Sequence, residues 1–237
     1  MRAGESRVQF PSRSASRTGA TPIRRPRYSG LMTMPDSETG SSAPEGTPTE
    51  DARFLRERAR FGRQLARYAE RHPEDVDTVR RFERLLEAGR DAFVREHPGG
   101  HFTASALVFD PARTSIVLTH HRKLDIWIQL GGHADGQADL VTAARREAEE
   151  ESGLSGLELS SPEIVDIDIH PIPAHGSEPP HEHYDVRFAF IAAGGRDLVV
   201  SDESHDLAWV AVDRVAEYSD EPSLHRAVAR ALAQLDG

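Results

Sequence analysis

A glycine followed by a strongly acidic segment, GHADGQADLVTAARREAEEESGL at 132–154, constrains this chain more than any other feature. If residues 139–152 are helical, each residue turns by about 100°, which puts Glu147, Glu150 and Glu151 on one face. Apolar residues of the same segment form a neighbouring stripe. Three carboxylates so close repel one another, and a hard divalent cation with oxygen ligands neutralises them most readily. The segment therefore predicts a helix that packs along one edge and binds magnesium or manganese along the next.

The spacing of several residues in this segment also matches a known sequence motif. Arg146 to Leu154 reads REAEEESGL, and together with Gly132 it resembles the Nudix box, written G-x5-E-x7-R-E-U-x-E-E-x-G-U with U a bulky aliphatic residue. The alternative is a solvated acidic helix face, which does not account for this spacing. Two positions depart from the pattern, because Ala138 stands in place of the first glutamate and Ala148 in place of a larger aliphatic residue.

The resemblance implies a divalent-metal-dependent hydrolase of a phosphoanhydride bond in a small substrate of the nucleoside-diphosphate-X type. It assigns metal ligation to four residues of the box: Gly132, Glu147, Glu150 and Glu151. It also makes Glu147 and Glu151 catalytic residues, with Glu147 as the general base inside the box. Arg146 becomes a structural salt-bridge partner of the carboxylates. The implied cofactor is Mg²⁺ or Mn²⁺.

Ala138 leaves a second function open. Asp139 lies next to it and is a candidate to supply the missing carboxylate. If nothing replaces that carboxylate, the alternative is a catalytically weak or silent Nudix-fold module that binds a nucleotide or regulates another protein. A third alternative is a transition-metal hydrolase centred on the histidines described below.

Residues outside the box supply further candidates. Glu203 lies six residues before Trp209 in SDESHDLAW, and Nudix proteins often carry another acidic residue on a loop before a late strand with a tryptophan. Glu203 is therefore a candidate catalytic base or metal ligand, against the alternative of an exposed loop acid. Trp127 is suited to stack on a base or sugar, although a tryptophan on a strand more often packs in the core. The candidate substrate-binding residues are Trp127, Arg122, His183 and Asp185.

Four histidines crowd into DIDIHPIPAHGSEPPHEHYD: His170, His175, His181 and His183. On a strand, His181, His183 and Asp185 would share one face, as would the alternate residues 166, 168 and 170. Imidazole together with carboxylate suits a transition metal. The same residues would also suit substrate phosphates or the polar face of a sheet, so three roles stay open.

Composition narrows the class of protein. A chain of 237 residues, 38% of them hydrophobic, holds one ordinary globular domain and a modest extension. Its net charge of -10 disfavours nucleic acid as a partner, because phosphate binding relies on clustered Lys and Arg. It has no cysteine, and no stretch of about 18 apolar residues that would span a membrane. We expect a cytoplasmic protein with a small-molecule diphosphate substrate, and a homodimer as a family-level expectation.

The chain divides into three regions by pattern. Residues 1–48 are rich in Ser, Arg, Pro, Gly and Thr, which predicts a disordered tail. A translation start at Met32 or Met34 instead of Met1, or a basic targeting arm, are alternatives for this region. Residues 49–98 show apolar residues at helical spacing, and we expect a helical hairpin packed on the core.

Residues 99–237 switch to short strands and form the Nudix-like domain. Strands are expected at 103–109, 115–119, 126–130, 163–170, 184–192 and 207–212. A loop at Gly131 and Gly132 leads into the acidic helix, and a last helix is expected at about 222–235. The fold class is therefore α/β (α+β), a Nudix-type α/β/α sandwich with a mixed sheet, preceded by an N-terminal helical hairpin.

Overall fold

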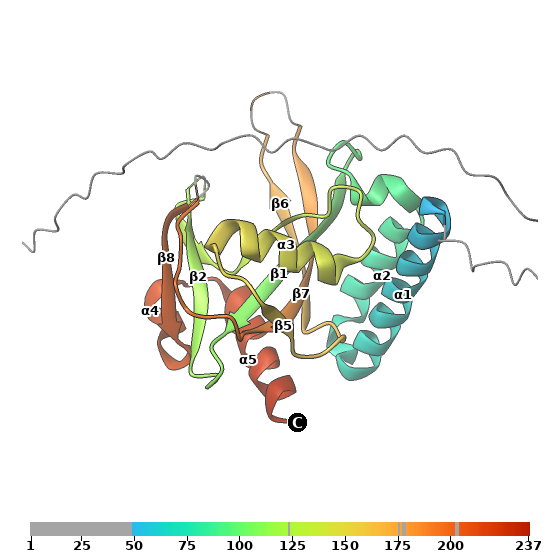
Figure 1. The fold of residues 1–237 in the computed structure, drawn as a ribbon. Coiled ribbons are helices and arrows are strands. Elements are labelled where there is room, and N and C mark those ends of the chain that lie inside the picture. The colour runs from blue at the N-terminus through green and yellow to red at the C-terminus, as the bar shows by residue number, and fades with distance from the viewer. Residues whose placement is uncertain (1–48, 123, 175, 177–178, 202–203) are drawn as a thin grey trace, which may run out of the picture. The chain divides into compact units, whose positions relative to one another are not determined.

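The computed structural model describes five ranges of the chain (Figure 1): residues 49–122, 124–174, 176, 179–201 and 204–237. The tail expected at 1–48 lies outside the described residues, as do Glu203 and His175. All described residues belong to one compact unit. None of the helices in these ranges is both long and apolar enough to cross a bilayer.

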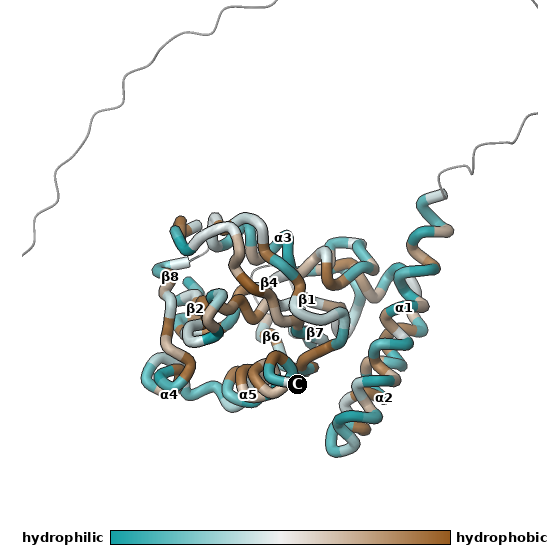
Figure 2. The backbone as a smooth tube through the Cα atoms, turned by 60° about the horizontal axis from the view of Figure 1, so that its bottom comes forward, coloured by the Kyte–Doolittle hydropathy of each residue, from teal (hydrophilic) through white to brown (hydrophobic). Residues whose placement is uncertain are grey.

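Two helices form the expected N-terminal hairpin. Helix α1, Glu50–Arg71, begins after Thr49, whose hydroxyl accepts a hydrogen bond from the Ala52 amide (3.3 Å). A 3₁₀ turn connects it to α2, Val76–Leu86, and a second 3₁₀ turn follows at Gly89–Phe93. Figure 2 shows hydrophobic and hydrophilic residues mixed along both helices, as expected for helices that pack on one side only.

A mixed sheet of eight strands forms the centre of the described part of the chain. Its strands are β1 Gly100–Phe109, β2 Ser115–His121, β3 Ile126–Ile128, β4 Leu130–His133, β5 Leu157–Leu159, β6 Asp166–Ile172, β7 His181–Ala192 and β8 Ser204–Ala211. The pair β1 and β7 is parallel, and the other pairs are antiparallel. Because β1 and β7 are parallel and in register, residues about 80 positions apart meet side by side.

The prediction of a loop at Gly131 and Gly132 is wrong, because both residues lie in a strand. Gly131 and Gly132 belong to strand β4 and pair with Ser105 and Ala104 of β1. A Cβ on Gly131 would lie 2.7 Å from Ser105 Cα and 2.8 Å from the Ala104 carbonyl oxygen, so only glycine lets β4 approach β1 this closely. A glycine pair that is typical of a turn thus marks a close approach of two backbones. The strand expected at 126–130 is accordingly two strands, β3 and β4.

Side chains alternate along the central strands, so the two faces of the sheet bury different clusters. Phe102 of β1 faces α1, α2 and α3 (Leu140–Ser152). Leu107 of β1 faces α5 (Pro222–Asp236), which covers the other side (Figure 1). The fold is therefore the expected α/β/α arrangement around a mixed sheet. The sequence did not predict β5 or the short helix α4 (Val215–Tyr218), since three or four residues are too few to show a period.

Candidate active site

Helix α3 carries the glutamates of the box, and its first residue is fixed by a cap. The Asp139 carboxylate accepts hydrogen bonds from the Thr142 amide (3.3 Å) and the Thr142 hydroxyl (2.8 Å). The helix ends at Ser152, where Gly153 takes the left-handed conformation with φ +69°. Both Asp139 oxygens thus accept a hydrogen bond at the helix start, where the side chain is the N-cap of α3.

We predict that Asp139→Ala lowers the free energy of unfolding by about 1 kcal/mol, because the orphan amide of Thr142 loses its acceptor. Urea denaturation followed by circular dichroism measures the change. Asp139→Asn is the matched control, since asparagine caps a helix about as well as aspartate. An equal loss in both variants would show that the carboxylate acts through something other than the cap.

The Glu147 carboxylate lies against Gly132 of β4. A Cβ on Gly132 would fall 2.5 Å from Glu147 Cδ, so the glycine leaves the space that the carboxylate occupies. Arg146 Nη1 is 2.7 Å from Glu147 Oε1. Burial raises the pKa of Glu147, Arg146 opposes that rise, and the negative charges of Glu150 and Asp135 add to it.

Glu151 and Glu150 take different positions beside the same strand. Glu151 is buried and accepts a hydrogen bond from the Gly131 amide (2.9 Å). Glu150 faces solvent, with 62% of its side chain exposed, 3.4 Å from Arg146 Nη1. Arg146 also donates to the carbonyl oxygen of His133 (3.0 Å). The guanidinium therefore links two glutamates of α3 to the end of β4.

These carboxylates fit a hard divalent cation by their chemistry. Glu147 and Glu151 present oxygen donors at Gly131 and Gly132, and Glu150 is the third acidic residue at hand. In the described part of the chain, however, the box glutamates do not form a group of three with ligand atoms within 4.8 Å of one another. Such a group does exist elsewhere and consists of histidines.

Ala138 is a packing position in this chain. Its side chain is buried and belongs to the core cluster that α3 shares with the N-terminal helices. A nearby acidic residue that sequence reasoning missed is Asp135, which Arg95 holds by two hydrogen bonds of 2.8 and 3.0 Å. Its charge contributes to the pKa of Glu147. The only signal in the sequence was its place three residues after Gly132.

Trp127 and Arg122 lie near β2 and β3. The Trp127 ring stacks on His120, with centroids 5.2 Å apart and planes 8° apart, and meets Tyr218 edge-on at 5.3 Å. It also packs against the core cluster under α5. Arg122 donates to the carbonyl oxygen of Ser204 (3.1 Å). In the strand order, β2 and β1 separate β3 from β7, so these two candidates are not neighbours of the two candidates on β7.

The candidates on β7, His183 and Asp185, lie on the polar face that β7 shares with the start of β1. Asp185 is buried and accepts hydrogen bonds from the Thr103 hydroxyl (3.1 Å), the Ser105 hydroxyl (2.8 Å) and Arg187 Nε (2.8 Å). A substrate would have to displace one of these donors to bind Asp185. Buried hydrogen bonds of this kind hold the strands in place.

His183 belongs to a group of buried rings. Burial lowers the pKa of His183 to about 2 and the pKa values of His101 and His133 to about 4. Charge on neighbouring histidines contributes a smaller part of each of these lowered pKa values, and Arg95 contributes to those of His101 and His133. All three rings are therefore neutral at pH 7. His101 was not predicted as a site residue. The signal in the sequence was its position two residues before Thr103, which would put both side chains on the same face of a strand.

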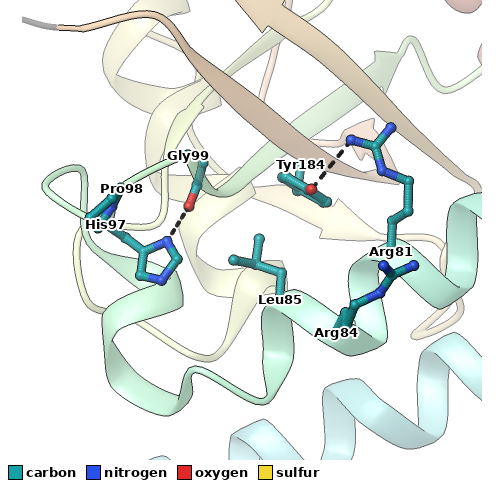
Figure 3. Close-up of a pocket in the computed structure, with 8 residues that line it drawn as sticks. Arg81, Arg84, Leu85, His97, Pro98, Gly99 and Tyr184 are labelled. Atoms are coloured by element: carbon teal, nitrogen blue, oxygen red, sulfur yellow. Dashed lines mark hydrogen bonds between the residues drawn. The ribbon is translucent and has the colours of Figure 1, made fainter.

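A pocket of about 480 Å³ opens between α2 and the starts of β1 and β7 (Figure 3). Arg81, Arg84, His97 and Tyr184 are among its lining residues. The Tyr184 ring packs edge-on against Phe82 of α2, so the pocket lies on the opposite face of β7 from His183. None of the predicted site residues lines it.

Comparison with known proteins identifies the family. Residues 99–232 match the model for the NUDIX domain, which is more than half of the chain. This protein therefore belongs to the Nudix hydrolase family, whose members act on nucleoside diphosphate derivatives and generally use divalent metals. None of the curated protein sequences compared with this chain matches it.

Solved structures of Nudix proteins are similar to this chain at low sequence identity. RenU, a Nudix hydrolase from M. smegmatis, is 22% identical, with a TM-score of 0.44 over 58% of this chain and 86% of that chain. The dihydroneopterin triphosphate pyrophosphohydrolase of E. coli is 15% identical, with a TM-score of 0.45 over 54% and 92%. The NUDIX domain of Shewanella oneidensis NrtR, solved with ADP ribose, is 14% identical, with a TM-score of 0.39 over 56% and 87%.

Proposed function

We propose that this protein is a pyrophosphohydrolase that cleaves the phosphoanhydride bond of a small nucleoside-diphosphate-X substrate with Mg²⁺ or Mn²⁺. The observation that carries the proposal is the contact of two box carboxylates with β4, Glu147 at Gly132 and Glu151 at the Gly131 amide. These contacts hold two carboxylates at neighbouring residues of one strand, where their oxygens can serve as ligands of one hard divalent cation.

Each box residue has a role in this proposal. Glu147, Glu150, Glu151 and Gly132 would hold the cation, which would supply charge neutralisation for the phosphates and a lowered pKa for bound water. Glu147 accepts the proton of the attacking water. Arg146 orients Glu147 and Glu150 through its ion pairs. Glu203 remains a candidate for a second base or ligand.

The proposal extends to the rest of the chain. We place the Nudix-like domain at residues 99–237 and the helical hairpin at 49–98. The enzyme would act in the cytoplasm on a small molecule, and a homodimer is compatible with the family. Trp127, Arg122 and His183 remain candidates for substrate contact, whereas Asp185 is better suited to holding β1 against β7.

The second candidate function is a silent Nudix-fold module that binds a nucleotide. The observation in its favour is Ala138, which is buried in the core and leaves the box without its first carboxylate. The neighbouring carboxylate, Asp139, accepts its hydrogen bonds from Thr142 at the start of α3.

Turnover of a substrate panel separates the two functions. The panel contains nucleotide sugars, dinucleoside polyphosphates, coenzyme diphosphates and nucleoside triphosphates, each with Mg²⁺ or Mn²⁺, and the phosphorylated products are separated from the substrate by anion-exchange chromatography and measured. We expect turnover by the native chain and at least about 100-fold lower kcat in Glu151→Gln, because a carboxylate at the metal is lost.

Glu149→Gln is the matched control on the same helix, because residue 149 lies about 160° around α3 from residue 151. It should keep near-native turnover. Absence of turnover by a folded protein that still binds nucleotide would favour the silent module.

A further inference from the structure

Three histidines from two strands meet at the start of the parallel pair β1 and β7. His101 pairs in register with His183, and His181 lies two residues earlier on the same face of β7. One ring nitrogen from each lies within 4.8 Å of the other two. The ring centroid of His101 is 5.1 Å from that of His181 and 4.9 Å from that of His183.

The buried ring of His101 has no hydrogen-bond partner among the described residues. His101 is only 1% exposed, and neither its Nδ1 nor its Nε2 forms a hydrogen bond within the described part of the chain. A buried polar group without a partner costs about 1–3 kcal/mol, so proteins rarely retain one that nothing binds. Three other imidazole rings contact that of His101, with centroid distances of 5.1 Å to His133, 5.1 Å to His181 and 4.9 Å to His183.

The hydrogen bond of His181 fixes which of its nitrogens is free to bind a cation. His181 Nδ1 is 3.0 Å from the carbonyl oxygen of Pro179, so Nδ1 carries the proton and Nε2 carries the lone pair. A histidine that binds a metal commonly donates its other N–H to a carbonyl in this way.

The spacing of the nitrogens matches a small tetrahedral ion. His181 Nε2 and His183 Nε2 are 3.3 Å apart. Two nitrogens bound to zinc at about 2.0–2.1 Å with tetrahedral angles would be about 3.3–3.4 Å apart. Without an ion these two nitrogens form a hydrogen bond. One ion between them would replace that hydrogen bond, and His101 would supply the third ligand.

We propose that His101, His181 and His183 form a second metal site, which binds a first-row transition-metal ion of the Zn²⁺ type. Three imidazoles and no carboxylate suit Zn²⁺ and disfavour Mg²⁺, which requires oxygen ligands. Three protein ligands leave a fourth position open to water or to another ligand. The site is separate from the box glutamates, although His133, which contacts its rings, directly follows Gly132.

Zinc binding by the full chain, prepared without a histidine tag, tests this site. Residues 1–48 contain neither histidine nor cysteine, so they add no nitrogen or sulfur side-chain ligand that competes with the three histidines. Isothermal titration with Zn²⁺ should give one ion per chain in the presence of excess Mg²⁺. Co²⁺ in place of Zn²⁺ should give the intense visible absorption of tetrahedral coordination by nitrogen.

His181→Ala and His183→Ala should each weaken Zn²⁺ binding by at least about 100-fold. The matched control is His205→Ala, since His205 is exposed on β8, which pairs with β2. Circular dichroism establishes that each variant is folded. The double variant Glu147→Gln, Glu151→Gln should bind Zn²⁺ as the native chain does, which separates this site from the proposed hydrolase activity.

Three results would overturn the proposal. The first is a native chain that binds no Zn²⁺ at concentrations of about 100 μM, well above those at which structural zinc sites fill. The second is unchanged binding in folded His181→Ala and His183→Ala. The third is loss of Zn²⁺ binding in the Glu147→Gln, Glu151→Gln variant, since it would assign the ion to the box.

Discussion

Replacing Gly132 with alanine is expected to lower kcat by about 100-fold, because the new Cβ displaces the carboxylate of Glu147 from its place beside β4. The Cβ would overlap with Glu147 Oε2 and lie 2.5 Å from Cδ. Both atoms are at the end of a flexible side chain, which can turn away. The free energy of unfolding should therefore change little, and kcat and urea denaturation should be measured on the same preparation.

Gly131→Ala is the matched control for this prediction. There the added Cβ meets backbone atoms, Ser105 Cα at 2.7 Å and the Ala104 carbonyl oxygen at 2.8 Å, which cannot turn away. We expect this variant to lose stability first. In Glu147→Gln, adding Gly132→Ala should lower kcat no further, since both changes remove the same group. A full additional 100-fold loss would mean that Gly132 acts through something other than Glu147.

Asp166→Asn is expected to lower the free energy of unfolding by about 3–5 kcal/mol, because it removes a buried carboxylate charge that three arginines share and leaves their positive charge only partly balanced. Asp166 is fully buried and accepts hydrogen bonds from Arg187 Nη1 (3.1 Å), Arg226 Nε (3.0 Å) and Arg230 Nη1 (2.5 Å). Arg187 has only 2% of its side chain exposed. Guanidinium chloride denaturation measures the change.

The control for Asp166 is Asp77→Asn on α2. Asp77 pairs with Arg80 at 2.8 Å, but 90% of its side chain is exposed, and a surface pair of this kind contributes at most about 1 kcal/mol. The comparison isolates burial, since both changes remove one carboxylate charge. If the two variants lost equal stability, burial of the arginine network would not be what makes Asp166 important.

The sequence predicted elements whose pattern is local. The acidic helix expected at 139–152 spans Leu140–Ser152, because its apolar stripe, its cap and its final glycine all lie within one short segment. Gly131 and Gly132 were assigned to a loop because glycine marks both turns and close backbone approaches. Only the neighbouring strand, with Ser105 against Gly131, distinguishes the two.

The histidine group could not be predicted in full because it depends on a pairing between distant segments. His181 and His183 stood out as a local cluster, whereas His101 joins them only through the parallel register of β1 with β7. The arginine network has the same origin, since Arg187 meets Asp166 across β6 and β7. Alternation along a strand predicts which residues share a face, but it does not predict which strand lies next to it.

The contacts of Arg230 limit how far the chain can be shortened from its N-terminus. This residue of α5 binds Asp75, in the 3₁₀ turn between the two helices of the hairpin, at 2.7 Å, and it also binds Asp166 of the sheet. Phe61 and Phe82 of the hairpin pack on Phe102 of β1. A chain shortened to the segment that matches the family would keep every residue of the box. It would also expose the aromatic face of β1 and remove two carboxylates that pair with Arg230, those of Asp75 and Glu74. The segment that matches the family model is therefore shorter than the compact unit of the structure, which includes the N-terminal hairpin.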